Sequence, residues 1–108
     1  MKTEKIISHL IKPLVLTGMY KNEDVALKDI IITHIEKKIK AYTKTIRFFE
    51  RKHKKDFDAF TKDIENKATS ELEDDWMEWK GAIEMEKEWS VALREVIESN
   101  TKLQSMRY

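Results

Sequence analysis

The chain has no cysteine, one proline and two glycines among its 108 residues. Without cysteine it can form neither a disulfide framework nor a thiolate-ligated metal site, which fits a reducing cytoplasm. With so little proline and glycine it has few of the turn residues that a many-stranded sheet needs. The main apolar run, residues 6–16, is short and is broken by His9, Lys12 and Pro13. We therefore expect a cytoplasmic all-α protein with neither a membrane helix nor a signal peptide.

Charge is abundant and unevenly distributed along the chain. Charged residues make up 38% of the sequence and the net charge is +1. Residues 1–55 nevertheless carry fourteen Lys and Arg against six Asp and Glu, whereas residues 56–108 carry seven against fourteen. This split predicts either a basic arm that packs on an acidic arm or a basic face that meets an anionic partner, and both interpretations are open.

The middle of the chain predicts one long helix over residues 22–54. Asn22 is the expected N-cap residue, and no helix breaker follows it before residue 54. Apolar side chains recur at heptad spacing; they are Val25, Ile32, Ile35, Ile39, Tyr42, Ile46 and Phe49. A helix of this length in so small a protein must lie against a helix of similar length, in the same chain or in a second copy.

The remaining elements complete a helical hairpin. Asp56 is the expected cap of a short helix over residues 56–66, and Ser70 with Glu73 has the capping-box spacing that opens a helix over residues 70–100. A short N-terminal helix is kinked or ended by Pro13. We predict an all-α fold with two long antiparallel helices joined by a short one, in a single domain over residues 1–108, in which residues 1–20 could form an arm.

Residues 70–89 gather three tryptophans. Trp76 and Trp79 share a helix face that Ile83 continues, and Gly81 is expected to allow a close approach of another helix. The tryptophans could fill the hairpin core or a surface that meets another chain. The residues predicted for self-association or partner binding are Ile35, Ile39, Tyr42, Ile46, Phe49, Trp76, Trp79 and Trp89.

The same segment carries many carboxylates, which could suggest a metal site. They are Glu71, Glu73, Asp74, Asp75, Glu78, Glu84, Glu86 and Glu88. Capping, the helix dipole and a solvated face account for this run of charge. We therefore expect no metal, no cofactor and no catalytic residue.

Basic residues over 37–55 could contact nucleic-acid phosphates. The candidates are Lys37, Lys38, Lys44, Arg47 and Arg51. No nucleic-acid-binding motif accompanies them, and the interleaved aromatics, Tyr42, Phe48 and Phe49, fall on or beside the apolar seam and are interpreted as core. Arg47 and His53 also have the R-x5-H spacing of HEPN-type helical ribonucleases, in which the imidazole moves protons and the arginine binds phosphate.

Two segments resemble a family of small helical proteins of archaea and some bacteria. Residues 49–60 read FERKHKKDFDAF and residues 72–79 read LEDDWMEW. They are similar to an F-E-x-K-Y-G-M-x-F-x-x-F segment followed by an acidic E-x-D-x-x-x-W element. Proteins with these segments look like antitoxins, commonly encoded beside small ribonuclease-type toxins. The resemblance covers about residues 35–98. Here His53-Lys54-Lys55 stands where the family usually has Tyr-Gly-Met, so the glycine that would end the long helix is Lys54.

Residues 16–29 are similar to the G-x-Y-x-S/N-E-x-x-A-L-x-D turn and helix of many antitoxins. In some antitoxins this element belongs to a ribbon-helix-helix DNA-binding unit. The alternating strand that such a unit requires is not evident in residues 1–8, so DNA binding is not inferred from this likeness.

The resemblance, the heptad seam and the charge split together predict a non-enzymatic protein-interaction module. It is expected to be antitoxin-like, to self-associate, with a dimer favoured, and to bind a protein partner such as a toxin. The alternatives are a nucleic-acid-binding regulator that uses residues 37–55 and a ribonuclease that uses Arg47 and His53.

Overall fold

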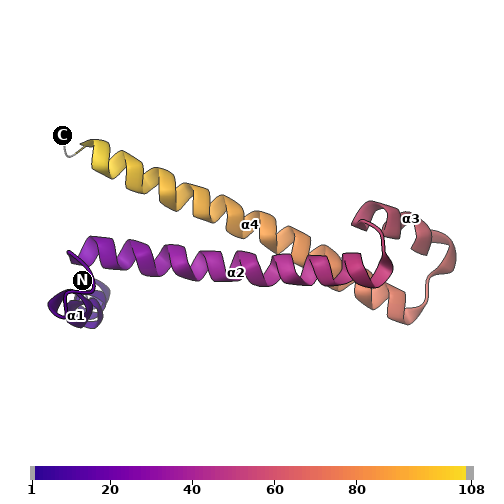
Figure 1. Ribbon diagram of the computed structural model, residues 1–108, viewed down its shortest axis with the longest axis horizontal. Helices are drawn as coiled ribbons and strands as arrows, with labels where there is room; N and C mark the ends of the chain where they lie inside the picture. Colours follow the sequence, from indigo (N-terminus) through magenta and orange to yellow (C-terminus); the bar gives the residue numbers. More distant parts are fainter. Residues whose placement is uncertain (1, 107–108) are drawn as a thin grey trace. The chain divides into compact units, whose positions relative to one another are not determined.

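The computed structural model describes the backbone of residues 2–106 and the side chains of residues 3–99. It contains four helices (Figure 1): α1 (Lys2–Leu16), α2 (Glu23–His53), α3 (Phe57–Lys67) and α4 (Ser70–Met106). The all-α prediction is confirmed. The bounds of α2 and α3 lie within one residue of those predicted, whereas α4 continues six residues beyond the predicted end at residue 100.

The chain divides into two compact units. Unit 1 comprises the residues up to His34 together with those from Arg94 onward, and unit 2 comprises Ile35–Leu93. Unit 1 therefore holds α1 and the start of α2 with the end of α4. Unit 2 holds the rest of α2, all of α3 and most of α4.

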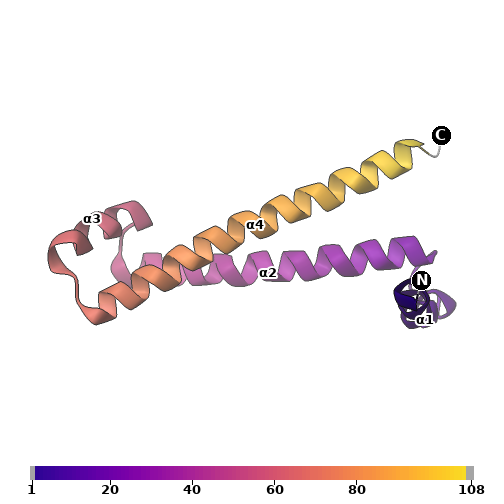
Figure 2. The ribbon, with the colours of Figure 1, turned by 180° about the vertical axis from the view of Figure 1, so that it is seen from behind.

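In unit 2 the long helices pack against each other in opposite directions (Figure 2). The Thr43 hydroxyl donates a hydrogen bond to the Glu86 carboxylate at 2.6 Å, and the Phe49 ring stacks on Trp79 at 5.7 Å. Because residue numbers rise along α2 while those of their partners fall along α4, the pair is antiparallel. α3 connects the end of α2 to the start of α4.

The core of unit 2 is aromatic. Trp79 is fully buried, and the Phe49 and Phe60 side chains are each only 2% exposed. The Trp79 ring lies 5.3 Å from Phe60 and 5.4 Å from Phe57, so residues of α2, α3 and α4 all contact it. Partly buried apolar side chains pack around this cluster; they are Ile46, Phe57, Ile64, Leu72, Trp76 and Ile83. One indole thus holds three helices together.

Local hydrogen bonds set where the helices begin. The Val25 amide donates to the Asn22 side chain at 2.9 Å and the Ala59 amide to Asp56 at 2.8 Å, which confirms both predicted caps. The predicted capping box of α4 is wrong, because Thr69 caps this helix instead of Ser70. The Leu72 amide donates to the Thr69 hydroxyl at 3.2 Å. Thr69 precedes Ser70 and offers an equivalent hydroxyl oxygen as the cap. Ser70 is therefore the first residue of the helix.

The helix α1 passes through Pro13 instead of ending there. The proline ring removes one amide donor and leaves the carbonyl four residues earlier without its helical partner. Both Pro13 and His9 are exposed, so water can solvate that carbonyl. The helix ends at Leu16, where Gly18 adopts φ +80° and the Met19 amide donates to the Leu14 carbonyl at 3.1 Å. This is a Schellman ending, which confirms the predicted break at residue 18.

Two details of the predicted packing are wrong. Val25 is 45% exposed, and the neighbouring Ala26 is fully buried in its place, because the side of α2 that packs within unit 1 is turned by one residue. Gly81 does not serve a close helix approach, since a Cβ atom built there meets nothing within 4 Å.

Lys54 ends α2 in the conformation that glycine would otherwise supply. Its φ is +55°, in the left-handed region, and it follows directly after His53, the last helical residue. A lysine pays a steric cost there because its Cβ approaches the following carbonyl oxygen. The helix therefore ends here as it would with glycine, but the backbone at Lys54 is strained.

We expect Lys54→Gly to stabilise the protein by about 1 kcal/mol, because glycine adopts this conformation without the Cβ penalty. Chemical denaturation followed by circular dichroism measures the change. Lys62→Gly, within α3, is the matched control and should destabilise by about 1 kcal/mol. Loss of stability in both variants would contradict a strained left-handed residue at position 54.

Candidate functional site

The predicted association residues divide between the core and its margin. Ile35, Phe49 and Trp79 are buried, whereas Ile39, Tyr42, Ile46, Trp76 and Trp89 are partly buried. The Trp76 indole N–H donates to the Thr61 hydroxyl at 2.9 Å and so ties α4 to α3. Of the two interpretations of the tryptophans, the one that places them in the hairpin core therefore holds for Trp79. The five partly buried residues lie on the same two helices, α2 and α4.

A buried carboxylate joins the ends of two helices in unit 2. Asp75, near the start of α4, is 9% exposed. Its Oδ2 accepts from Lys52 Nζ at 2.7 Å and lies 2.9 Å from His53 Nε2, both at the end of α2. Since an ionised carboxylate can only accept, His53 donates from Nε2. The imidazole itself lies among aromatic rings, with its centroid 4.2 Å from that of Phe60.

The electrostatics of Asp75 follow from these contacts. Burial alone would raise the pKa of this carboxyl, but the hydrogen bonds and the charge interactions with Lys52 and His53 together outweigh burial and hold the pKa below its ordinary value. The same bond to Asp75, opposed by partial desolvation, raises the pKa of Lys52. Asp75 is thus a structural anion: it does not belong to the solvated part of the acidic run, and its pairing with Lys52 is the kind of contact expected between a basic and an acidic arm.

The ribonuclease pair is not assembled on one face of α2. Arg47 and His53 are six residues apart, which turns them by about 120° from each other around a helix. Arg47 is exposed, whereas His53 lies toward α3 and α4. Glu50 and His53 have the Glu-x-x-His spacing of a bundle di-metal ligand pair, but Glu50 is exposed. Within residues 3–99, no group of three or more potential ligands is placed to hold a metal ion.

Unit 1 exposes large apolar side chains. On α1, Ile6 is 58% and Leu10 is 68% exposed, one helical turn apart on the same face. Leu16 and Met19, at the end of α1, are 75% and 67% exposed. Ile11 lies on the other side of α1 and is buried. α1 is therefore apolar on two sides, and only one of them is covered.

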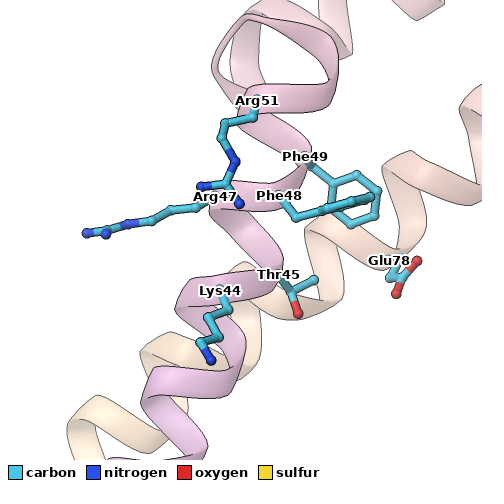
Figure 3. Close-up of a pocket in the computed structure, with 7 residues that line it drawn as sticks. All are labelled: Lys44, Thr45, Arg47, Phe48, Phe49, Arg51 and Glu78. Atoms are coloured by element: carbon cyan, nitrogen blue, oxygen red, sulfur yellow. The ribbon is translucent and has the colours of Figure 1, made fainter.

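A basic face runs along the part of α2 that belongs to unit 2. Of the predicted nucleic-acid contacts, Lys37, Lys44, Arg47 and Arg51 are exposed, whereas Lys38 is half-buried. Phe48 lies beside them and is 52% exposed, so its interpretation as a core residue is wrong. Figure 3 shows Arg47 extending away from α4 while Phe48 turns over Phe49. An open depression of about 550 Å³ lies here, and it is lined by Lys44, Thr45, Arg47, Phe48, Phe49 and Arg51 of α2 and by Glu78 of α4.

Comparisons with protein-family models, with curated proteins and with solved structures give no match to this chain. In the described part of the chain, no helix combines the length and apolar character required to cross a bilayer. The functional argument therefore rests on the surfaces themselves.

Sequence reasoning missed two features of these surfaces. The buried Asp75 follows Asp74 in a charged run, and only the contact of Asp75 with the end of α2 distinguishes the two neighbours. The exposed side of α1 could have been found from the four-residue spacing of Ile6 and Leu10.

We expect Asp75→Asn to destabilise the protein by about 1–3 kcal/mol near neutral pH, because Lys52 and His53 lose a charged acceptor. The pKa of Asp75 lies below its ordinary value, so its stabilising contribution is present above about pH 4 and is lost as the pH falls through the folded-state pKa. The difference in free energy of unfolding between wild type and variant should therefore become smaller at acidic pH. Urea unfolding followed by tryptophan fluorescence measures this free energy.

Asp74→Asn is the matched control for this substitution, since Asp74 is the adjacent carboxylate and is exposed. Its effect should stay within about 0.5 kcal/mol. Equal effects of the two substitutions, or a difference for Asp75→Asn that does not change with pH, would contradict the assigned role.

Proposed function

We propose that this protein is a non-enzymatic, antitoxin-like interaction module that forms a homodimer through unit 1 and binds a small protein partner. The observation that carries the proposal is the uncovered apolar side of α1, with Ile6 and Leu10 at its centre. Exposed apolar surface costs about 25 cal/mol per Å² relative to burial, so a contiguous face of this kind favours coverage by another chain.

A second copy is the simplest occupant of this face. A twofold dimer brings identical patches together, so one apolar stripe suffices for both sides of the interface. The start of α2, in the same unit, also exposes apolar side chains, since Ile30 and Ile31 are 41% and 39% exposed. Residues 35–98 resemble antitoxins, and this resemblance supports a protein partner in addition to the second copy of the chain.

Dimerisation is tested by light scattering coupled to size-exclusion chromatography. Wild type should elute with twice the chain mass of 12.9 kDa, and Leu10→Glu should shift the protein to the monomer mass. Met77→Glu is the matched control, because Met77 is 66% exposed but lies on α4 in unit 2, and it should remain dimeric. A monomeric wild type, or a dimer unaffected by Leu10→Glu, would refute the interface.

The partner is tested by co-expression with the small protein encoded by the neighbouring gene. That protein alone should arrest growth, and co-expression of this chain should restore growth and give a complex that purifies intact. A soluble neighbour that neither arrests growth nor binds this chain would rule out the antitoxin-like role.

A further inference from the structure

We propose that the outer face of α2 in unit 2 binds single-stranded nucleic acid, with Phe48 as the platform on which an unpaired base stacks. The site is formed by Lys37, Lys40, Lys44, Arg47, Phe48 and Arg51. It goes beyond the proposed dimer, which uses unit 1, and beyond the proposed protein partner, because its ligand is a nucleic acid.

The cations of this site form one continuous stripe. Their spacing along α2 alternates between three and four residues, which places all five within roughly 80° of the helix circumference. The stripe extends about 21 Å along the helix at 1.5 Å per residue. All five side chains are exposed, and none takes part in the ion pairs found within residues 3–99. Their charge is therefore available to an anionic ligand.

The charge on this stripe is not compensated along the helix. Over residues 37–55, nine Lys and Arg accompany a single acidic residue, Glu50. Glu50 is turned by about 100° from the centre of the stripe. Lys52, also turned by about 100° from the centre of the stripe, is paired with Asp75. The acidic arm thus pairs with a cation beside the stripe and leaves the stripe itself positive.

Phe48 gives the stripe a feature that a merely solvated basic helix lacks. Its ring is half exposed and packs edge-on against Phe49, with centroids 5.2 Å apart and an interplanar angle of 77°. Phe49 is buried in the core, so the Phe48 ring is held in place from beneath while the rest of it faces solvent. Lys44, Arg47 and Arg51 line the same depression as this ring, and Arg47 extends away from it (Figure 3).

This combination favours a single nucleic-acid strand over other anions. Non-specific single-strand binding uses a basic track for the phosphates and an aromatic ring for the bases. A paired base in a duplex cannot reach such a ring. A membrane-surface helix needs a broad apolar side next to its cations, whereas Phe48 is the large apolar residue exposed on this part of α2. Glu78, at the edge of the depression, can accept a hydrogen bond from a base amino group.

Fluorescence anisotropy with the full chain and labelled oligonucleotides of about twelve nucleotides tests the proposal. RNA and DNA single strands are compared with a duplex of the same sequence, which identifies the preferred nucleic acid. We expect single strands to bind more tightly than the duplex. If all five cations contact phosphates, the logarithm of the affinity should fall with the logarithm of salt concentration at a slope of about −3.5.

Substitutions of the ring and of the cations separate the roles of the two. Phe48→Ala should weaken single-strand binding about ten-fold and leave the salt slope unchanged, and Phe48→Trp should restore the affinity. Lys44→Glu combined with Arg47→Glu should weaken binding and flatten the slope by at least about 1.4. Lys62→Glu combined with Lys87→Glu changes the net charge equally at exposed sites on α3 and α4, so it is the matched control.

The proposal is overturned if wild type does not bind at low salt, if it binds the duplex as tightly as the single strand, or if the control pair weakens binding as much as the pair on the stripe. Circular dichroism of each variant confirms that the helices are retained. The result is independent of the dimer, because Leu10→Glu leaves every residue of this site in place.

Discussion

The burial of Trp79 is the constraint on which unit 2 depends. This side chain is completely enclosed and is contacted by aromatic rings from α2 and α3. Two long helices alone bury only a narrow strip of side chains between them. α3 adds to this core because its Phe57 and Phe60 rings pack on the indole of Trp79. The position of α3 then fixes which side of α2 faces inward. The outward position of Phe48 and the basic stripe is a consequence of that choice.

The contact between Asp75 and the end of α2 reinforces the same arrangement. The carboxylate of Asp75 near the start of α4 and the ammonium group of Lys52 at the end of α2 each complement their own helix dipole, and they also pair with each other. Lys52 and His53 satisfy the buried charge together. His53 also packs on Phe60 of the aromatic core, so the polar contact and the apolar core constrain one another.

The uneven charge of the chain has two interpretations, a basic arm packed on an acidic arm and a basic face for an anionic partner. Different sides of α2 support each of them. Lys52, at the end of α2, pairs with the acidic helix, as internal compensation predicts. The outward stripe from Lys37 to Arg51 has no such partner among the described residues and is the basis of the proposed nucleic-acid site. The apolar side of α1, in unit 1, is a separate surface with a separate proposed ligand, another protein chain.

The sequence by itself determined the helices, because the signals that define them are local: heptad spacing along α2, the caps at Asn22 and Asp56, and the break at Gly18. It could not decide between equivalent neighbours, such as Thr69 and Ser70 as cap, Asp74 and Asp75 as buried anion, or Phe48 and Phe49 as core ring. Only the tertiary structure decided these, since burial depends on where α3 and α4 return against α2, and adjacent residues on a helix point about 100° apart.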